Sequence, residues 1–287
     1  MSILFRQLTI CGVGLIGGSF ALNARRHRLV ERIVGLGRSQ ANLDTALARG
    51  LIDFATRDPA EAAHRADLVM LATPIMTFSA TLAAMIPHLP PDSVVTDVGS
   101  VKTWVVEQLE PLLKSTMSFV GVHPVAGKET TGAAAAQEDL FVNQRVIVTP
   151  SPGSHAEAIE KVEALWRATG ARVERMEPAQ HDGILALASH LPQMVASALA
   201  SALADETIDG HWAAAYGAGG LRDTTRIAAS SPEMWRDICL TNREALVPAL
   251  RLYRNWFERF EQAVAASDGE ALNQLFERGR RMRIRMN

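Results

Sequence analysis

The chain reads Thr9-Ile10-Cys11-Gly12-Val13-Gly14-Leu15-Ile16-Gly17-Gly18-Ser19 near its start, and this stretch contains the spacing G-x-G-x-x-G. An apolar run at residues 8–11 predicts a strand before it, residues 19–27 have a helical pattern, and residues 33–36 form a second apolar run. In a strand-turn-helix-strand unit of this size, the glycines permit a tight turn, close approach of the backbone to a pyrophosphate, and close helix packing. The unit is therefore predicted to bind a dinucleotide through Gly12, Gly14, Leu15, Ile16 and Gly17.

The residues after the second strand indicate which dinucleotide is bound. When NAD is the cofactor, an acidic residue about twenty positions after the third glycine accepts hydrogen bonds from the ribose 2′-hydroxyl. Here that position is Gly37, followed by Arg38 and Ser39. A guanidinium and a hydroxyl can donate to a 2′-phosphate, and no carboxylate repels it. NADP is therefore predicted as the preferred cofactor, with NAD also possible.

Composition limits the classes of function. The chain has 287 residues, of which 48% are hydrophobic and 21% charged, as in a soluble globular protein of two domains. A net charge of -2 gives no electrostatic reason to expect nucleic acid or a membrane surface as a partner. Cys11 and Cys239 lie far apart without a C-x-x-C pair, so neither a disulfide framework nor a metal site is predicted. Polar residues interrupt the alanine-rich segment 184–203, which favours a buried helix over a membrane span. We expect a cytoplasmic protein.

Strand and helix patterns divide the chain into two parts. Further strands are predicted at 68–72, 94–97, 119–122, 145–149 and 172–175, separated by helical patterns at 77–86, 101–113 and 155–169. This alternation predicts an α/β domain with a doubly wound, mostly parallel sheet of the Rossmann type. The strand pattern then stops, and helical patterns cover 180–204, 213–218, 224–229, 232–266 and 269–284. We therefore expect a dinucleotide-binding domain over residues 1–177 and an all-helical domain over 178–287.

Residues that directly follow the strands are the candidates for chemistry, because ligands of such sheets bind at the carboxyl ends of the strands. Thr73 and Pro74 follow the strand at 68–72 and are expected to lie against the cofactor. Ser100 follows the next strand, and His123 stands at the end of the one after. A histidine beside a nicotinamide site suits hydride abstraction from a carbon that bears a hydroxyl, because that step needs an acceptor for the hydroxyl proton.

Five motifs then occur in order along nearly the whole chain: GVGLIGGS at 12–19, DVGSVK at 97–102, HPVAG at 123–127, SHLP at 189–192 and GGLRDTTRIA at 219–228. Together they resemble the prephenate/arogenate (cyclohexadienyl) dehydrogenase family of tyrosine biosynthesis. The resemblance implies a nucleotide-binding domain, a helical dimerisation domain that forms a homodimer, and an active site in the cleft between them. The implied reaction is the oxidative decarboxylation of prephenate or arogenate, in which hydride leaves the ring carbon bearing the hydroxyl and carbon dioxide leaves the opposite carbon.

The same resemblance implies roles for individual residues. His123 matches the catalytic histidine, which must be neutral to accept a hydrogen bond from the ring hydroxyl. Ser100 matches a serine that bonds both this histidine and the ring hydroxyl. Arg226 matches the arginine that binds a substrate carboxylate, and Arg222 takes an auxiliary electrostatic role; for either, the competing interpretation is an ion pair with a nearby acid.

The floor of the implied site contains one departure from the family. His190 and Trp235 match residues there, although for Trp235 packing is favoured over contact with substrate. Gln193 stands where many prephenate-preferring relatives carry a second histidine. A glutamine amide can serve either a keto or an amino-acid side chain, so we expect arogenate to be used at least as well as prephenate.

Two other functions share this architecture. One is a β-hydroxyacid-type dehydrogenase or an imine reductase, and the hydroxyacid type generally has a catalytic lysine in the second domain. No lysine follows Lys161 here, which weighs against that reading. The other is a non-catalytic dinucleotide-binding regulator, against which the presence of Ser100, His123 and Arg226 argues.

Overall fold

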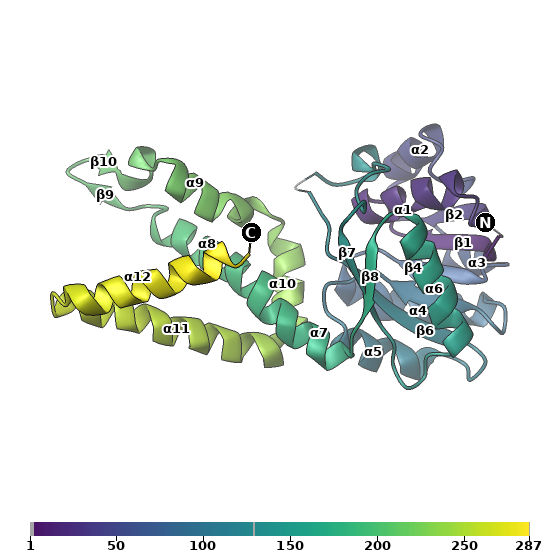
Figure 1. The fold of residues 1–287 in the computed structure, drawn as a ribbon. Coiled ribbons are helices and arrows are strands. Elements are labelled where there is room, and N and C mark those ends of the chain that lie inside the picture. The colour runs from purple at the N-terminus through teal and green to yellow at the C-terminus, as the bar shows by residue number, and fades with distance from the viewer. Residues whose placement is uncertain (1–2, 129, 287) are drawn as a thin grey trace.

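The computed structural model describes residues 3–128 and 130–286, and Figure 1 shows them as a strand-rich part beside a helical part. The strand-rich part contains one sheet of eight strands in the order β3-β2-β1-β4-β5-β6-β7-β8. Its strands are β1 Phe5–Cys11, β2 Val30–Leu36, β3 Phe54–Thr56, β4 Leu68–Leu71, β5 Val94–Asp97, β6 Ser118–Pro124, β7 Arg145–Thr149 and β8 Arg172–Arg175.

The sheet is mostly parallel, as the alternation of patterns predicts. Only β6 and β7 pair in antiparallel fashion. All seven predicted strands are present, and the sequence patterns missed β3. This strand has three residues, lies at the sheet edge beside β2, and alternates too briefly to be recognised from pattern.

Helices cover both faces of the sheet, each over its own apolar core. One face carries α1 (Leu15–Arg26), α2 (Gln40–Ala48) and α6 (Ala156–Ala168); the other carries α3 (Pro59–Ala63), α4 (Phe78–Met85) and α5 (Thr103–Leu109). On the first face, Trp166 is fully buried, with its ring 4.7 Å from that of Phe20 and 5.1 Å from that of Phe141. Burial of a side chain such as Phe20 contributes about 1.5–3 kcal/mol, so this packing stabilises α1 and α6 on the sheet.

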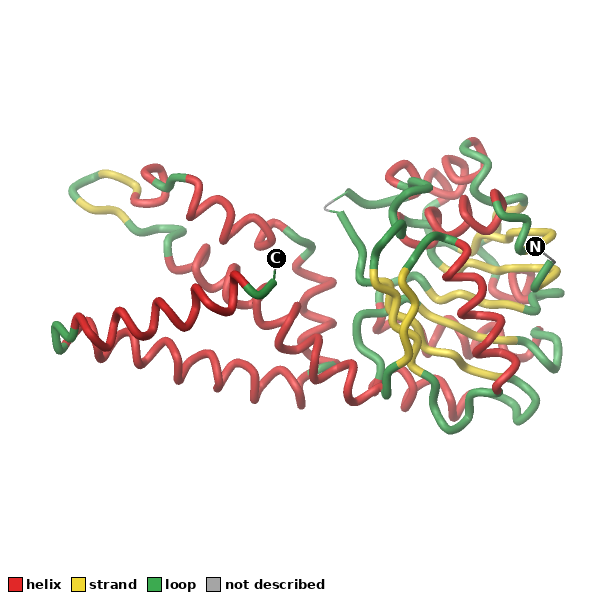
Figure 2. Tube along the Cα trace, in the orientation of Figure 1, coloured by secondary structure: helices red, strands yellow, loops and turns green. Residues whose placement is uncertain are grey.

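The rest of the chain is mainly helical, as Figure 2 shows in red. It contains α7 (Pro178–Leu185), a π-helical turn (Ala186–His190), α8 (Leu191–Ala202), α9 (Gly219–Thr225), α10 (Pro232–Thr241), α11 (Arg243–Ala265) and α12 (Gly269–Ile284). Short 3-10 turns occupy Ile75–Thr77, Ile86–His88, Glu110–Leu112, Ala133–Ala135, Ala213–Tyr216 and Arg226–Ala229. The helical part contacts the sheet part through α7, which packs on α5 and β7, and through α10, which packs on Ile75–Thr77.

The helical part differs from the sequence patterns in three places. The helices expected over 213–218 and 224–229 are the 3-10 turns Ala213–Tyr216 and Arg226–Ala229, and α9, most of which was not expected to be helical, lies between them. The single helix expected over 232–266 is broken at Asn242, which separates α10 from α11. A short hairpin of β9 (Thr207–Ile208) and β10 (His211–Trp212) was not expected. Its turn is Asp209-Gly210, with φ values of 50° and 81°. Asp-Gly is a favoured turn for two-residue hairpins, because both positions require positive φ.

The segment from α7 to α8 is one continuous helical run. Within the described residues it is the one helix long and apolar enough to cross a membrane, judged by length and composition alone, and 28% of its most apolar window is buried. The expected burial is met at Ala186 and His190, whereas Leu187 and Leu199 are 48% and 36% exposed. The buried side of this run faces the site described next.

Candidate active site

The glycine-rich turn between β1 and α1 has the geometry of a phosphate site. Gly12 has φ +95°, and a Cβ there would lie 2.6 Å from the carbonyl oxygen of Ala72 and 2.9 Å from Thr73 Cγ2. At Gly17 a Cβ would lie 2.5 Å from the carbonyl oxygen of Gly12, whereas at Gly14 it would meet no atom within 4 Å. Among the described residues, no side chain caps the start of α1. Backbone N–H groups at an uncapped helix N-terminus can bind an anion, which fits a dinucleotide pyrophosphate.

The expected ribose-binding residues lie at the end of β2. Ser39 caps α2 by accepting a hydrogen bond from Asn42 N at 3.3 Å, and Arg38 is exposed. The sequence analysis missed Arg57, which directly follows β3, the strand paired with β2. Both arginines thus stand at the carboxyl edge of neighbouring strands, and no ion pair engages either one in the described part of the chain. Pro74, like Thr73, follows β4 at the same edge, and it precedes the turn Ile75–Thr77.

A buried ion pair connects the ends of β5 and β6. The side chains of Lys102 and Asp97 are both fully buried and form a hydrogen-bonded salt bridge. Lys102 Nζ also donates to the carbonyl oxygen of Val122 at 2.8 Å, and Asp97 accepts from Gly99 N at 2.7 Å. Burial raises the pKa of Asp97 and lowers that of Lys102, while the ion pair opposes both shifts. This pair holds the turn that contains Ser100 against β6.

His123 lies on β6 with 8% of its surface exposed. Its Nδ1 is 2.9 Å from Nε2 of His181, and Nδ1 of His181 is 2.8 Å from Oδ1 of Asp182. Burial, followed by the nearby charges of His181, Lys102 and His190, holds the pKa of His123 well below 6.5. His123 is therefore neutral at neutral pH, as a proton acceptor must be.

Ser100 is half-buried in the turn before α5. Among the described residues it makes no hydrogen bond to His123, whose ring is bonded to His181 instead. Nor does Ser100 cap the helix: α5 begins at Thr103, and the Asp182 carboxylate accepts from Lys102 N and Thr103 N, both at 2.8 Å. A residue of the helical part thus caps a helix of the sheet part.

His190 and Trp235, which the resemblance places at the floor of the site, are in contact with each other. Their rings meet edge to face at 5.9 Å, and His190 is buried in the π-helical turn. Asn242 Nδ2 lies 3.0 Å from His190 Nδ1 and donates to it, so the ring proton belongs on Nε2. That Nε2 and Trp235 Nε1 are buried and have no hydrogen-bond partner within the described residues. Burial lowers the pKa of His190 to about 4.

Gln193 connects this floor to the segment of Arg226. It is buried, and its Nε2 donates to the carbonyl oxygen of Ile227 at 3.0 Å. Arg226 begins the 3-10 turn Arg226–Ala229, and Arg222 lies on α9; both side chains are exposed. Asp237, an acid close to them in sequence, pairs with Arg236 at 2.6 Å.

Comparison with known proteins now decides the family. A family model described as prephenate dehydrogenase, nucleotide-binding domain, matches residues 20–175, and one described as prephenate dehydrogenase, dimerization domain, matches residues 177–278. The chain belongs to the prephenate dehydrogenase family. The resemblance stated from the five motifs is therefore confirmed, as is the Rossmann-type domain followed by a helical one.

Individual members of the prephenate dehydrogenase family are similar over their whole length. Cyclohexadienyl dehydrogenase of Zymomonas mobilis is 35% identical, over 98% of this chain and 96% of the relative. The structure of Aquifex aeolicus prephenate dehydrogenase in complex with hydroxyphenyl propionate and NAD⁺ superposes with a TM-score of 0.94 at 33% identity, covering 100% of both chains. Synechocystis arogenate dehydrogenase gives 0.83 at 32% identity, covering 98% of this chain and 100% of the other.

In this member of the prephenate dehydrogenase family, sequence reasoning missed four residues that surround His123 and His190. Lys102 was quoted only as part of a motif, and Asn242 lay inside an expected helix. His181 and Asp182 are adjacent in sequence and lie in α7, the first helix after the last strand of the sheet part. The one feature of the sequence that could have indicated these two residues was a histidine next to an aspartate at the junction of the two parts. Pattern alone could not show that their partner is His123.

Proposed function

We propose that this chain catalyses the oxidative decarboxylation of prephenate, arogenate or both, with hydride transfer to NAD(P), in tyrosine biosynthesis. The observation that carries the proposal is His123, a buried neutral imidazole at the carboxyl edge of the sheet, in a chain of the prephenate dehydrogenase family. Such a group can take a proton from a hydroxyl while hydride leaves the same carbon.

The residues of the chain then have distinct roles. The turn of Gly12, Gly14 and Gly17 would hold a nicotinamide dinucleotide, which would supply the hydride acceptor. His123 accepts the proton of the ring hydroxyl as its carbon gains carbonyl character. When the opposite ring carbon loses carbon dioxide, the ring becomes aromatic, and His123 returns the proton to the phenolate oxygen. Ser100, in the turn beside β6, orients the same hydroxyl.

The hydrogen-bond donors of the helical part fit an anionic substrate. Among the described residues, His190 Nε2 and Trp235 Nε1 are buried and have no hydrogen-bond partner, whereas buried polar groups are normally satisfied. A substrate carboxylate or side chain would satisfy them. We assign a carboxylate to Arg226, whose planar guanidinium can donate two parallel hydrogen bonds, with Arg222 adding positive potential. Gln193 positions the Arg226 turn through Ile227 and leaves its amide oxygen as an acceptor for the amino group of arogenate.

For the cofactor, we propose that NADP is preferred over NAD. Gly37 offers no carboxylate to a ribose 2′-hydroxyl, and Arg38, Ser39 and Arg57 provide donors at the ends of β2 and β3. Two guanidinium groups on neighbouring strands favour a 2′-phosphate more than the single arginine considered from sequence.

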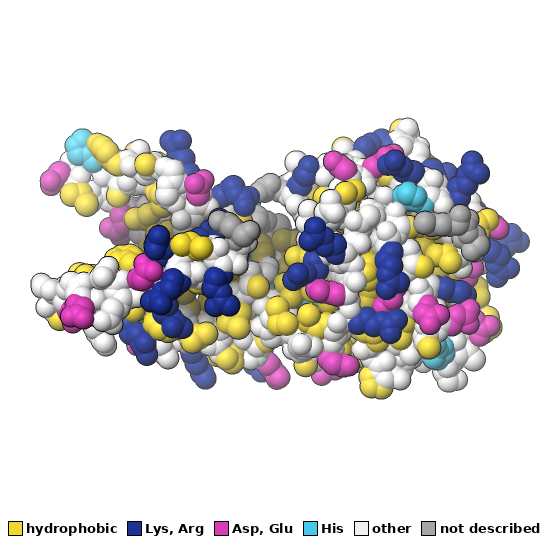
Figure 3. Space-filling view, viewed as in Figure 1, with side chains coloured by type: hydrophobic (Ala, Val, Ile, Leu, Met, Phe, Trp, Pro, Cys, Tyr) yellow, Lys and Arg dark blue, Asp and Glu magenta, His cyan; other side chains and the backbone are white. Residues whose placement is uncertain are grey.

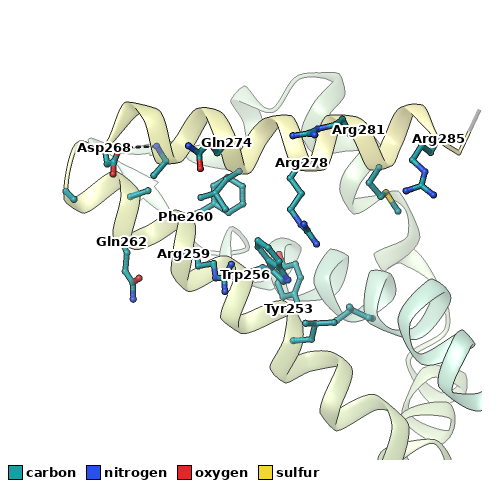
Figure 4. A pocket seen from close by; sticks show the side chains of 18 of the residues that line it. Tyr253, Trp256, Arg259, Phe260, Gln262, Asp268, Gln274, Arg278, Arg281 and Arg285 are labelled. Carbon is teal, nitrogen blue, oxygen red and sulfur yellow. Dashed lines mark hydrogen bonds between the residues drawn. The ribbon is translucent and has the colours of Figure 1, made fainter.

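We further propose that the protein is a cytoplasmic homodimer formed through its helical part. A groove of about 1790 Å³ lies between α11 and α12, and Figure 4 shows side chains that line it. The guanidinium groups of Arg259 and Arg278 are 4.4 and 4.5 Å from the ring centre of Trp256. Figure 3 shows arginine and apolar side chains exposed together at this end of the molecule. Phe257 and Phe276 are 61% and 65% exposed in the single chain. Large exposed apolar surface of this kind marks an interface, which fits the dimerization-domain match.

The test is the initial rate of reduction of NAD⁺ and NADP⁺ with prephenate and with arogenate. We expect turnover by the wild type, and a kcat about 10²- to 10⁴-fold lower for His123→Asn, with little change in substrate KM. Titration of reduced dinucleotide by fluorescence serves as the control, because both proteins should bind it equally. A folded wild type that binds dinucleotide but turns over neither substrate would instead be a regulator.

A further inference from the structure

We propose that His181 and Asp182 are positioning residues that hold His123 in the tautomer with a free, basic Nε2. This inference rests on the proposed function of His123 but concerns residues outside the five family-like motifs. The observation behind it is a continuous hydrogen-bonded chain from β6 to α7, in which His123 Nδ1 meets His181 Nε2 at 2.9 Å and His181 Nδ1 meets Asp182 Oδ1 at 2.8 Å.

The Asp182 carboxylate is the acceptor at the end of this series of hydrogen bonds, and it sets the direction of each bond. An ionised carboxylate only accepts, so Nδ1 of His181 carries a proton and donates it to Asp182. Burial lowers the pKa of His181, which is therefore neutral and has its lone pair on Nε2. His123 Nδ1 must then donate to that lone pair. The remaining nitrogen, Nε2 of His123, is left without a proton and is free to act as a base.

Asp182 is itself held ionised and immobile. Its carboxylate accepts from Lys102 N and Thr103 N at 2.8 Å each, in addition to His181. Burial raises the pKa of Asp182, but hydrogen bonds from His181, Lys102 and Thr103 outweigh it and leave the pKa below its ordinary value. Asn242 Nδ2 donates to the backbone carbonyl of Asp182 at 3.1 Å. Asp182 is thus held in place by its hydrogen bonds to Lys102 and Thr103, to His181 and to Asn242.

The same series of hydrogen bonds also affects the positive charge that forms on His123 when it accepts a proton. A protonated His123 would face Asp97 from the end of β5, Lys102 from the turn before α5, and His190 from the π-helical turn. It would also face His181 and Asp182 from α7. Lys102 is already neutralised by Asp97. Asp182 is the carboxylate that reaches His123 through hydrogen bonds, so it offsets the new positive charge through His181. Because α7 belongs to the helical part and β6 to the sheet, the tautomer depends on the contact between the two parts.

The test uses a matched pair of substitutions at one position. His181→Phe keeps a ring but removes the acceptor, whereas His181→Gln puts an amide oxygen near the place of Nε2 that can still accept from His123. We expect kcat to fall about ten- to a hundredfold in the phenylalanine variant, at the low end of what a general base contributes, and to recover largely in the glutamine variant. Substrate KM and binding of reduced dinucleotide should change little in both. His88→Phe, an exposed histidine on the sheet part, is the control for the chemical change.

A second measurement reads the tautomer without turnover. In protein labelled with ¹⁵N-histidine, His123 of the wild type should show a protonated Nδ1 and an unprotonated Nε2, with the resonance assigned by its loss in His123→Asn. His181→Phe should convert part or all of the signal to the other tautomer. An active wild type whose His123 has a proton on Nε2, or a His181→Phe variant with unchanged kcat and tautomer, would overturn the proposal. If His181→Phe does not fold, two other results decide: the tautomer of His123 in the wild type, and the tautomer and kcat of His181→Gln. A His181→Gln variant with the tautomer and kcat of the wild type supports the proposal.

Discussion

The buried Lys102 Nζ lies 2.8 Å from the carbonyl oxygen of Val122, the residue before His123, and donates a hydrogen bond to it. The same ammonium group pairs with Asp97 at the end of β5. One side chain therefore joins the ends of two neighbouring strands and sets the position of His123 along the sheet edge.

Lys102→Met should destabilise the protein by about 3–5 kcal/mol, because it leaves the Asp97 carboxylate buried without a partner charge. Urea unfolding measures this loss. The double variant Lys102→Met/Asp97→Leu should recover part of it, because no buried charge then remains. Equal stability of wild type and Lys102→Met would show that the pair is not held as an ion pair.

Stability should also fall as pH is lowered from 7 to 5. Burial lowers the pKa values of His123, His181 and His190, the last to about 4. In the unfolded chain each returns to about 6.5, so below that pH the unfolded state binds more protons than the folded one. The expected loss is at most about 1.4 kcal/mol per pH unit for each histidine. Urea unfolding of wild type and His190→Gln across this range is the measurement, and the variant should show the smaller slope; identical slopes would mean that His190 is not buried as a neutral group.

Arg226→Gln should weaken substrate binding by roughly 2–4 kcal/mol, the scale for truncating one member of a charged pair. The KM for dinucleotide should stay near that of the wild type, because the glycine-rich turn is untouched. Arg222→Gln should show a smaller loss in the same steady-state assay. A parallel fall in affinity for substrate and cofactor would assign Arg226 to the fold or the dimer instead.

The cofactor proposal predicts that Gly37→Asp with Arg38→Leu reverses the preference toward NAD, since an acceptor for the ribose hydroxyl appears and a phosphate donor is lost. The three atoms nearest to an added Cβ at Gly37 all belong to the buried Leu43 side chain, the nearest at 3.2 Å, so the aspartate requires a small shift of that side chain. Arg57→Ala alone should raise the KM for NADP and leave that for NAD unchanged. Steady-state rates with each cofactor provide the check, and a wild type that uses NAD far better than NADP would contradict the proposal.

Gln193→His should shift the ratio of kcat/KM toward prephenate by about 1–2 kcal/mol, the size of one altered polar contact. A partly cationic imidazole would repel the ammonium group of arogenate, whereas the glutamine oxygen can accept from it. The ratio is measured with both substrates under identical conditions. If it does not move, Gln193 acts only through its hydrogen bond to Ile227 and another group selects the side chain.

The sequence by itself determined the features whose signals are local in the chain. The glycine spacing over residues 12–17 and the apolar runs of seven strands each depend on residues within one turn or one strand, so pattern reveals them. The five motifs identified the family for the same reason, because each is a short continuous segment. Three residues of β3 and the helix break at Asn242 left no such pattern, since tertiary packing rather than local periodicity sets them.

Only the tertiary structure decided how the site is held together. His181 is 58 residues from His123 in sequence. Asp182 is 80 residues from Lys102, and its carboxylate accepts a hydrogen bond from the Lys102 backbone N–H. Such contacts arise where α7 of the helical part meets the carboxyl edge of the sheet, and no spacing in the chain encodes that meeting point. His123 could thus be proposed as the proton acceptor from its position at the end of a strand and from the family resemblance. Its neutral state and hydrogen-bond partner depend on burial and on side chains brought in from distant segments.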